Sequence, residues 1–217
     1  MSILVIAEHN NNELKGSTLN TITAANALAG DVALLVAGSN IDNVINESKV
    51  LDGLNKIFKC DSEIYKNSIA EDLSELILSV ADGYTHILAP ATTFGKNLMP
   101  RIAAKLDTQQ ISDIISVESD DTFKRPIYAG SCIAKVKSND PVKVITVRST
   151  AFDPVTKNNL DAQIEDINEV PSTGASKFVS EELAKSDRPE LTAANIVISG
   201  GRGMQSGDNF HLLDSIA

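Results

Sequence analysis

The 217-residue sequence contains no long hydrophobic run and no visible targeting stretch. Its longest apolar stretches, such as residues 32–37, are as short as a β-strand, whereas a membrane-spanning helix needs about 20 apolar residues. We therefore expect no membrane span. The first residues lead directly into a strand-like run without a basic or Arg/Ser-rich segment. This start favours a bacterial cytoplasmic protein, or the mitochondrial matrix if the source is eukaryotic.

Cysteine and basic residues are also scarce. Cys60 and Cys132 are far apart and have no Cys-x-x-Cys or Cys/His spacing, which argues against a disulfide, a metal site or a redox pair and favours two buried thiols. Lys and Arg number 19 against 29 Asp and Glu, a net charge of -10, and they form no cluster. We therefore expect no nucleic-acid partner.

Strand-like and helix-like patterns alternate over the first 106 residues. Continuous β-branched or apolar runs lie at residues 3–7, 32–37, 56–60 and 85–89. Apolar residues with helical spacing follow at residues 19–29, 41–45, 69–80 and 98–106, with Pro100 expected in a first turn. This alternation predicts an α/β fold with a Rossmann-like parallel sheet that is flanked by helices.

The pattern changes after Asp107. Four strand-like runs, at residues 114–117, 123–128, 132–136 and 142–147, are separated by turn signals. They predict β-rich additions, either antiparallel members of the sheet or a hairpin extension. A polar stretch then precedes a new apolar run, so we place an N-terminal α/β domain at residues 1–187. Residues 188–217 would begin a second α/β domain, which is too short to bury its own core.

A glycine-rich turn follows the apolar residues 196–198. These residues are expected to end a parallel strand, and Ser206 to cap a helix that begins near Gly207. Main-chain N–H groups of such a turn favour an anion, and Arg202 between Gly201 and Gly203 adds a permanent positive charge. The spacing is only loosely related to a dinucleotide fingerprint. From the pattern alone, a phosphate cradle and a plain strand-to-helix turn both remain open.

Other polar residues have weaker signals. Glu8 and His9 follow the first strand, at the usual ligand edge of a parallel sheet, yet the asparagines after them favour a solvated loop. Lys96 lies at a helix start after a strand and could assist an anion there. His86 and His211 have no ligand-spaced Cys or carboxylate, so we expect structural or surface roles.

Several motifs resemble one family, the alpha subunits of the electron transfer flavoproteins. In the C-terminal part these are Ser186-Asp-Arg-Pro-Glu-Leu, Val197-Ile-Ser-Gly-Gly-Arg-Gly and Ser206-Gly-Asp-Asn-Phe. In the N-terminal part they are Leu4-Val-Ile-Ala-Glu-His, Phe94-Gly-Lys-Asn-Leu-Met-Pro-Arg, Ile111-Ser-Asp-Ile, Arg125-Pro-Ile-Tyr-Ala-Gly and Val147-Arg-Ser-Thr-Ala-Phe-Asp. The motifs occur in the family's order and cover essentially the whole chain.

This resemblance implies a heterodimer with a beta subunit that carries one FAD, and AMP held mainly by the beta subunit. Such a heterodimer is an electron carrier without substrate turnover of its own. It accepts electrons from acyl-CoA and other dehydrogenases and passes them to a membrane quinone reductase. Arg202 would contact FAD, and Gly201 and Gly203 would shape the turn beside it. The family's later flavin-binding segments have no counterpart in these residues, so we expect an incomplete flavin site.

Two other functions fit the residues without the resemblance. The glycine turn could belong to a fragment of an NAD(P)-dependent oxidoreductase, in which it would bind a pyrophosphate. The N-terminal α/β domain could also be a stand-alone nucleotide-binding module. An acidic residue about 20 positions after the turn would support the first alternative, but the sequence printed here does not extend that far.

Overall fold

The computed structural model describes residues 1–158, 162–182, 191, 194, 196–214 and 216. It divides into two compact units, Met1–Phe178 and Val179–Ala217, which we treat separately. The domain boundary expected near Asp187 falls outside the described residues and stays a prediction.

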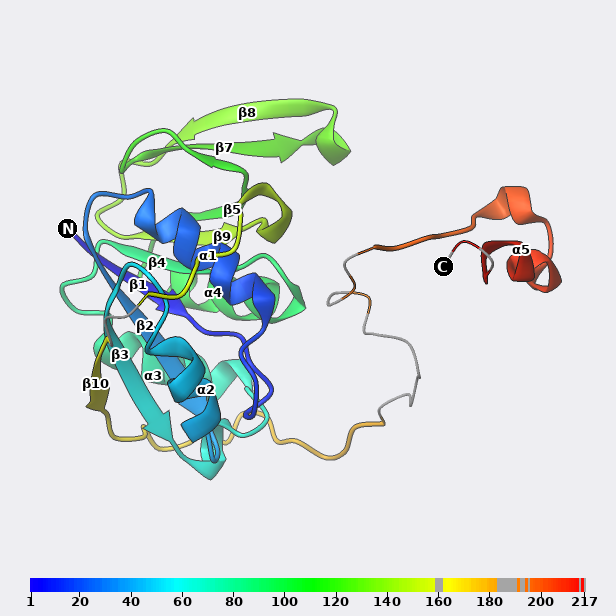
Figure 1. The fold of residues 1–217 in the computed structure, drawn as a ribbon. Helices are drawn as coiled ribbons and strands as arrows, with labels where there is room; N and C mark the ends of the chain where they lie inside the picture. Colours follow the sequence, from blue (N-terminus) through cyan, green and yellow to red (C-terminus); the bar gives the residue numbers. More distant parts are fainter. Residues whose placement is uncertain (159–161, 183–190, 192–193, 195, 215, 217) are drawn as a thin grey trace. The chain divides into compact units, whose positions relative to one another are not determined.

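A seven-stranded parallel sheet forms the centre of the first unit (Figure 1). Its strands are β1 (Ser2–Ile6), β2 (Asp31–Gly38), β3 (Leu54–Asp61), β4 (His86–Pro90), β5 (Gln110–Ile114), β9 (Lys143–Val147) and β10 (Gln163–Asp166), and their spatial order is β10-β3-β2-β1-β4-β9-β5. The chain builds outward from β1 to β3 and then restarts on the other side of β1 with β4. The topological switch point therefore lies between β1 and β4.

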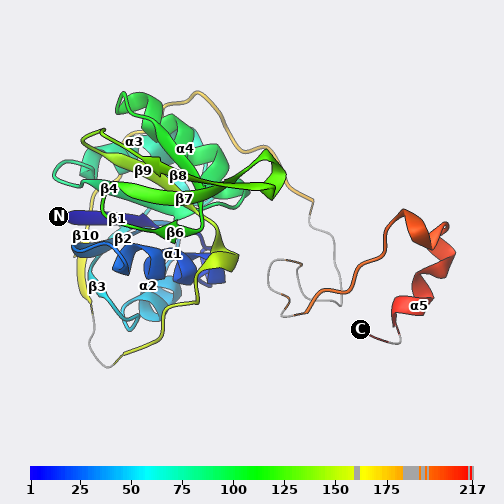
Figure 2. The same cartoon turned by 90° about the horizontal axis from the view of Figure 1, so that it is seen from above.

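Helices cover both faces of this sheet (Figure 2). On one face lie α1 (Gly16–Asn26) and α2 (Asp42–Ser48), and on the other α3 (Ala70–Val80) and α4 (Thr93–Lys105). Alternate residues of β1 point to opposite faces, so Ile3 and Val5 pack with α1 and α2 while Leu4 and Ile6 pack with α3 and α4. Burial on both sides explains the continuous apolar run of β1 and confirms the predicted α/β fold.

Helix α4 differs from its expected form at Pro100. The helix begins at Thr93, so Pro100 lies in its interior and not in the first turn. The earlier start is possible because Gly95 packs against the end of β4, where a Cβ would lie 1.9 Å from the carbonyl oxygen of Pro90. Pro100 has no N–H to donate to the carbonyl four residues earlier, so the helix lacks one hydrogen bond there.

The β-rich segment forms a second, antiparallel sheet with the order β6-β7-β8. Its strands are β6 (Ser116–Val117), β7 (Thr122–Ile127) and β8 (Cys132–Lys137), and β7 and β8 form a hairpin. This arrangement confirms the predicted hairpin extension. The alternative, antiparallel strands within the main sheet, is wrong, because β5 and β9 both join it in the parallel direction.

Strand β10 was not anticipated from the sequence. Its four residues, Gln163–Asp166, contain one apolar side chain and are all exposed, so no buried pattern marks them as a strand. They pair in parallel with β3 at the sheet edge, and Glu165 forms an ion pair with Lys56 at 2.8 Å. Backbone pairing and one charge pair thus define a strand that hydrophobicity does not predict.

The second unit contains only short elements among its described residues. These are η4 (Arg202–Met204), η5 (Gly207–Phe210) and α5 (His211–Asp214). The strand expected at residues 196–198 is wrong, because this stretch has no ladder partner and Ile196 is 82% exposed. None of the helices in the described part of the chain is long and apolar enough to cross a membrane.

Close packing at Gly95 gives a test of the fold. We expect Gly95→Ala to lower the free energy of unfolding by about 3 kcal/mol, because the new methyl group meets a backbone carbonyl that cannot move aside. Gly16→Ala is the matched control, since Gly16 also lies in a first helical turn and a Cβ there meets nothing within 4 Å. Urea unfolding measures both variants, and equal stabilities would contradict the packing described.

Candidate functional site

The glycine-rich turn of the second unit is held by local polar contacts. Ser206 caps η5, as expected, because its Oγ accepts a hydrogen bond from the backbone N–H of Asp208 at 3.2 Å. The Asn209 side chain donates to the carbonyl of Met204 at 2.8 Å and so joins η4 to η5. Arg202 is therefore the first residue of η4, which is held to η5 by this hydrogen bond.

The glycines of this turn have different steric roles. A Cβ on Gly201 or Gly203 would meet nothing within 4 Å, so their backbone lies in open space. At Gly200, in contrast, a Cβ would lie 2.7 Å from Cγ of Met204. Gly200 is thus the glycine of this turn at which an added side chain would force Met204 to move, which the spacing of the motif did not indicate.

Arg202 itself is exposed and belongs to none of the ion pairs found among the described residues. An exposed guanidinium beside two open glycine backbones can accept a phosphate or the edge of a ring without displacing a side chain. The contact of Arg202 with FAD stays a prediction. The turn provides no walls for a ligand, since the neighbouring residues 205–208 are exposed as well.

In the first unit, the switch point between β1 and β4 is filled by Glu8. Its Oε2 accepts hydrogen bonds from Ser17 Oγ of α1 at 2.8 Å and from Thr92 Oγ1, just before α4, at 2.9 Å. Parallel α/β sheets bind anionic ligands at this position, beside helix N-termini. Here a carboxylate of the chain itself lies between the first turns of two helices.

The sequence context of His9 suggested a solvated loop. In the structure His9 is instead a structural residue. Its Nε2 donates to the carbonyl of Ala37 at 3.1 Å, and Nδ1 accepts from the backbone N–H of Asn11 at 3.1 Å. Both contacts require the neutral ring with its proton on Nε2. Burial lowers the pKa of His9 to about 4, and the hydrogen bond to Ala37 offsets only part of this effect.

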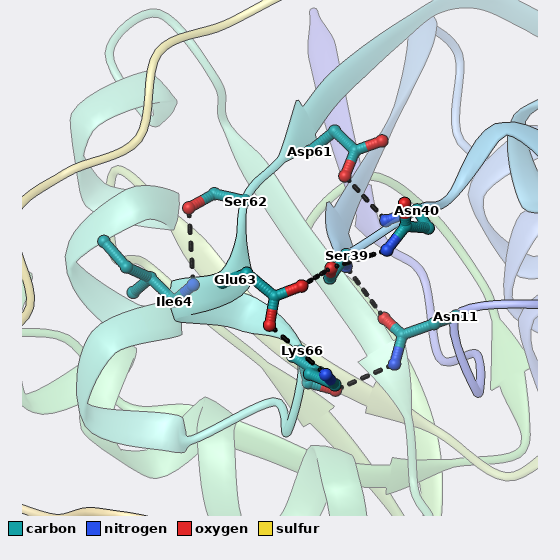
Figure 3. A network of polar contacts seen from close by, with 8 residues as sticks. All are labelled: Asn11, Ser39, Asn40, Asp61, Ser62, Glu63, Ile64 and Lys66. Atoms are coloured by element: carbon teal, nitrogen blue, oxygen red, sulfur yellow. Dashed lines mark hydrogen bonds and ion pairs between the residues drawn. The ribbon is translucent and has the colours of Figure 1, made fainter.

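Asn11 makes further hydrogen bonds at the carboxyl ends of β2 and β3 (Figure 3). Its Oδ1 accepts from the backbone N–H of Ser39 at 3.0 Å, and its Nδ2 donates to the carbonyl of Lys66 at 2.8 Å. The hydroxyl of Ser39 donates to Glu63, and this contact, followed by that of Lys66, lowers the pKa of Glu63. The carboxyl ends of β1, β2 and β3 are therefore linked by the chain's own polar groups.

The remaining candidates have no chemical role in the geometry. His86 is buried in β4, where Nε2 donates to the carbonyl of Asp120 at 2.6 Å, so its predicted structural role holds. Lys96 is exposed on α4. Cys60 is buried, which raises its pKa to about 11, but Cys132 is exposed, so the expectation of two buried thiols is wrong for Cys132. No group of His, Cys, Asp and Glu among the described residues could hold a metal ion.

Comparison with known proteins decides the family. The model of the electron transfer flavoprotein domain matches residues 3–174. The chain belongs to the electron transfer flavoprotein family, as an alpha subunit. It is 54% identical over 217 residues to the electron transfer flavoprotein subunit alpha of Pseudomonas aeruginosa, covering all of this chain and 70% of that protein.

Two further alpha subunits show how much of a family member this chain represents. The Bradyrhizobium diazoefficiens protein is 48% identical, with 97% of this chain and 67% of the relative aligned. The mitochondrial protein of Dictyostelium discoideum is 44% identical, with 99% of this chain and 65% of the relative aligned. The chain thus spans about two thirds of the length of these relatives. The resemblance that the sequence motifs indicated is confirmed.

The neutral His9 predicts a specific pH dependence of stability. Its folded pKa of about 4 lies below the unfolded value of roughly 6.5, so the unfolded state binds the proton more tightly. The stabilisation is complete above pH 6.5 and is lost as the pH falls towards 4. Between pH 7 and pH 4, we expect the wild-type chain to lose about 3 kcal/mol more stability than His9→Gln. Urea unfolding at both pH values measures the difference, and parallel losses would refute this role.

Proposed function

We propose that this chain provides the alpha-subunit scaffold, and one corner of the FAD site, of a heterodimeric electron carrier. Its partner would be the electron transfer flavoprotein beta subunit, which would also hold AMP. The carrier would accept electrons from dehydrogenases such as acyl-CoA dehydrogenases and deliver them to a quinone reductase, with no substrate turnover of its own. The observation that carries the proposal is the family match, which extends over the whole chain.

The candidate site supports a division of labour within the chain. Arg202 would hold the FAD through its exposed guanidinium, while Gly201 and Gly203 let the backbone approach. FAD supplies the one-electron redox chemistry when it is bound. The first unit would position the beta subunit and the stretch that joins the two units. It would bind no nucleotide itself. We infer a bacterial cytoplasmic or a mitochondrial matrix location, because the relatives include both bacterial and mitochondrial proteins.

The alternatives receive less support. A stand-alone nucleotide module would need a free anion position at the switch point, where Glu8 instead accepts two hydroxyl hydrogen bonds. An NAD(P)-dependent oxidoreductase fragment rests only on the glycine spacing of the turn, which is loosely related to the dinucleotide fingerprint. Both alternatives also lack the whole-chain similarity that supports the carrier.

The first test is the flavin content of the chain with and without its partner. We expect the 217-residue chain alone to bind FAD weakly, because the described residues around the turn at residues 200–203 are mostly exposed and provide no walls for the ligand. Co-expressed with a beta subunit, the Pseudomonas aeruginosa alpha subunit is the positive control and should give a yellow heterodimer. Stoichiometric, tightly bound flavin absorbance in the isolated 217-residue chain would contradict the incomplete site.

A substitution tests the role of Arg202 directly. In any heterodimer that retains flavin, we expect Arg202→Ala to weaken FAD binding by about 10- to 100-fold, because a hydrogen bond to a charged group contributes about 1.5–3 kcal/mol. Arg202→Lys keeps the charge but not the planar fork, so its loss should be smaller. Asp208→Asn in the same exposed turn is the control. FAD titration by fluorescence measures all three, and unchanged affinity in Arg202→Ala would remove this residue from the site.

A further inference from the structure

Residues 167–173 run along the outside of the first unit and end at a buried carboxylate. They follow β10 and are mostly exposed, with only Ile167 and Val170 partly packed against the core. At the far end, Asp72 of α3 is 4% exposed and belongs to none of the ion pairs of the described residues. We call residues 167–173 the strap.

Three donors at the end of the strap satisfy this carboxylate. Asp72 accepts from the Thr173 backbone N–H at 2.7 Å, from Thr173 Oγ1 at 2.9 Å and from Ser172 Oγ at 3.0 Å. Burial alone would raise the pKa of Asp72, but these hydrogen bonds outweigh it and hold the pKa below its ordinary value. Hydrogen bonds to a charged group are stronger than neutral ones, so this is the strongest attachment of the strap.

The other attachments are a few hydrogen bonds and the partial apolar packing of Ile167 and Val170. The Ile167 backbone N–H donates to the carbonyl of Lys59 at 2.8 Å, and the Val170 N–H donates to the hydroxyl of the buried Tyr65 at 3.0 Å. Ser62 donates to Glu169 between them. The strap has little buried apolar surface, and its side-chain hydrogen bonds are only partly buried or exposed. Such a segment opens at a lower free energy than the core of the sheet.

We propose that the strap opens as one piece, that Asp72 is its latch, and that opening leaves the sheet intact. The strap lies directly before the stretch that joins the two units, whose boundary falls between Phe178 and Val179. When the strap is closed, the linker within the first unit is residues 174–178, starting at Gly174 in a left-handed conformation with φ of +65°. Opening would add residues 167–173 to this linker, roughly 23–25 Å of fully extended chain. The latch therefore sets the length of the tether.

Native-state hydrogen exchange tests whether the strap is one unit. The variant is Asp72→Asn, which keeps the shape of the side chain, and the control is Glu71→Gln, which removes a neighbouring charge that pairs with Arg101 and does not touch the strap. We expect the Ile167 and Val170 amides, which do not bond to Asp72, to exchange at least tenfold faster in Asp72→Asn alone. The amides of β1 and β2 should keep their rates.

Two outcomes would overturn the proposal. Faster exchange at Thr173 alone would mean that Asp72 makes only a local hydrogen bond, and equally faster exchange in β1 and β2 would mean that it supports the whole fold. The double variant Ser172→Ala/Thr173→Val removes the hydroxyl donors from the strap side and leaves α3 unchanged. It should give the same pattern as Asp72→Asn, and it decides the question if Asp72→Asn does not fold.

Discussion

The burial of the parallel sheet on both faces is the constraint on which the rest of the structure depends. Both faces of β1 are covered, so its buried residues Ile3 to Ile6 are all apolar, and polar chemistry is displaced to the strand ends. Parallel strands place all their carboxyl ends at one edge, where ligands of such folds usually bind. In this chain Glu8, His9 and Asn11 use that edge for internal hydrogen bonds. This edge of the first unit is therefore closed by the chain's own polar groups.

The two units differ in how their polar groups are arranged. At the carboxyl edge of its sheet, the first unit pairs polar groups with one another, as shown by the contacts of Asn11 with Ser39 and Lys66. The second unit presents an exposed arginine on a short turn. The strap that ends at Asp72 would set where the stretch that joins the two units begins.

Sequence patterns predicted the buried parts of the fold and missed the features defined by polar contacts. Apolar periodicity identified β1, α1, β2 and α3, because burial leaves a clear signal in the residue types. It did not find β10, whose pairing with β3 is made by the backbone of exposed residues. The sequence pattern also gave the wrong surroundings for His9, because the asparagines after it suggested a solvated loop. In the structure Asn11 instead hydrogen-bonds to His9 and to Ser39 at the edge of the sheet. For Arg202, family motifs and not spacing carried the prediction.

The most direct test of this account is a titration of the chain with ADP, followed by amide chemical shifts in two-dimensional NMR. ADP carries phosphates that could bind at the switch point beside Glu8 or at the turn of residues 200–203. The account predicts that Glu8, Ser17 and Thr92 keep their shifts at millimolar ADP, and that any changes are confined to residues 200–203. Saturable shifts at Glu8 and Thr92, with a rise in the melting temperature of the first unit, would contradict the claim that the chain's own carboxylate occupies the ligand position.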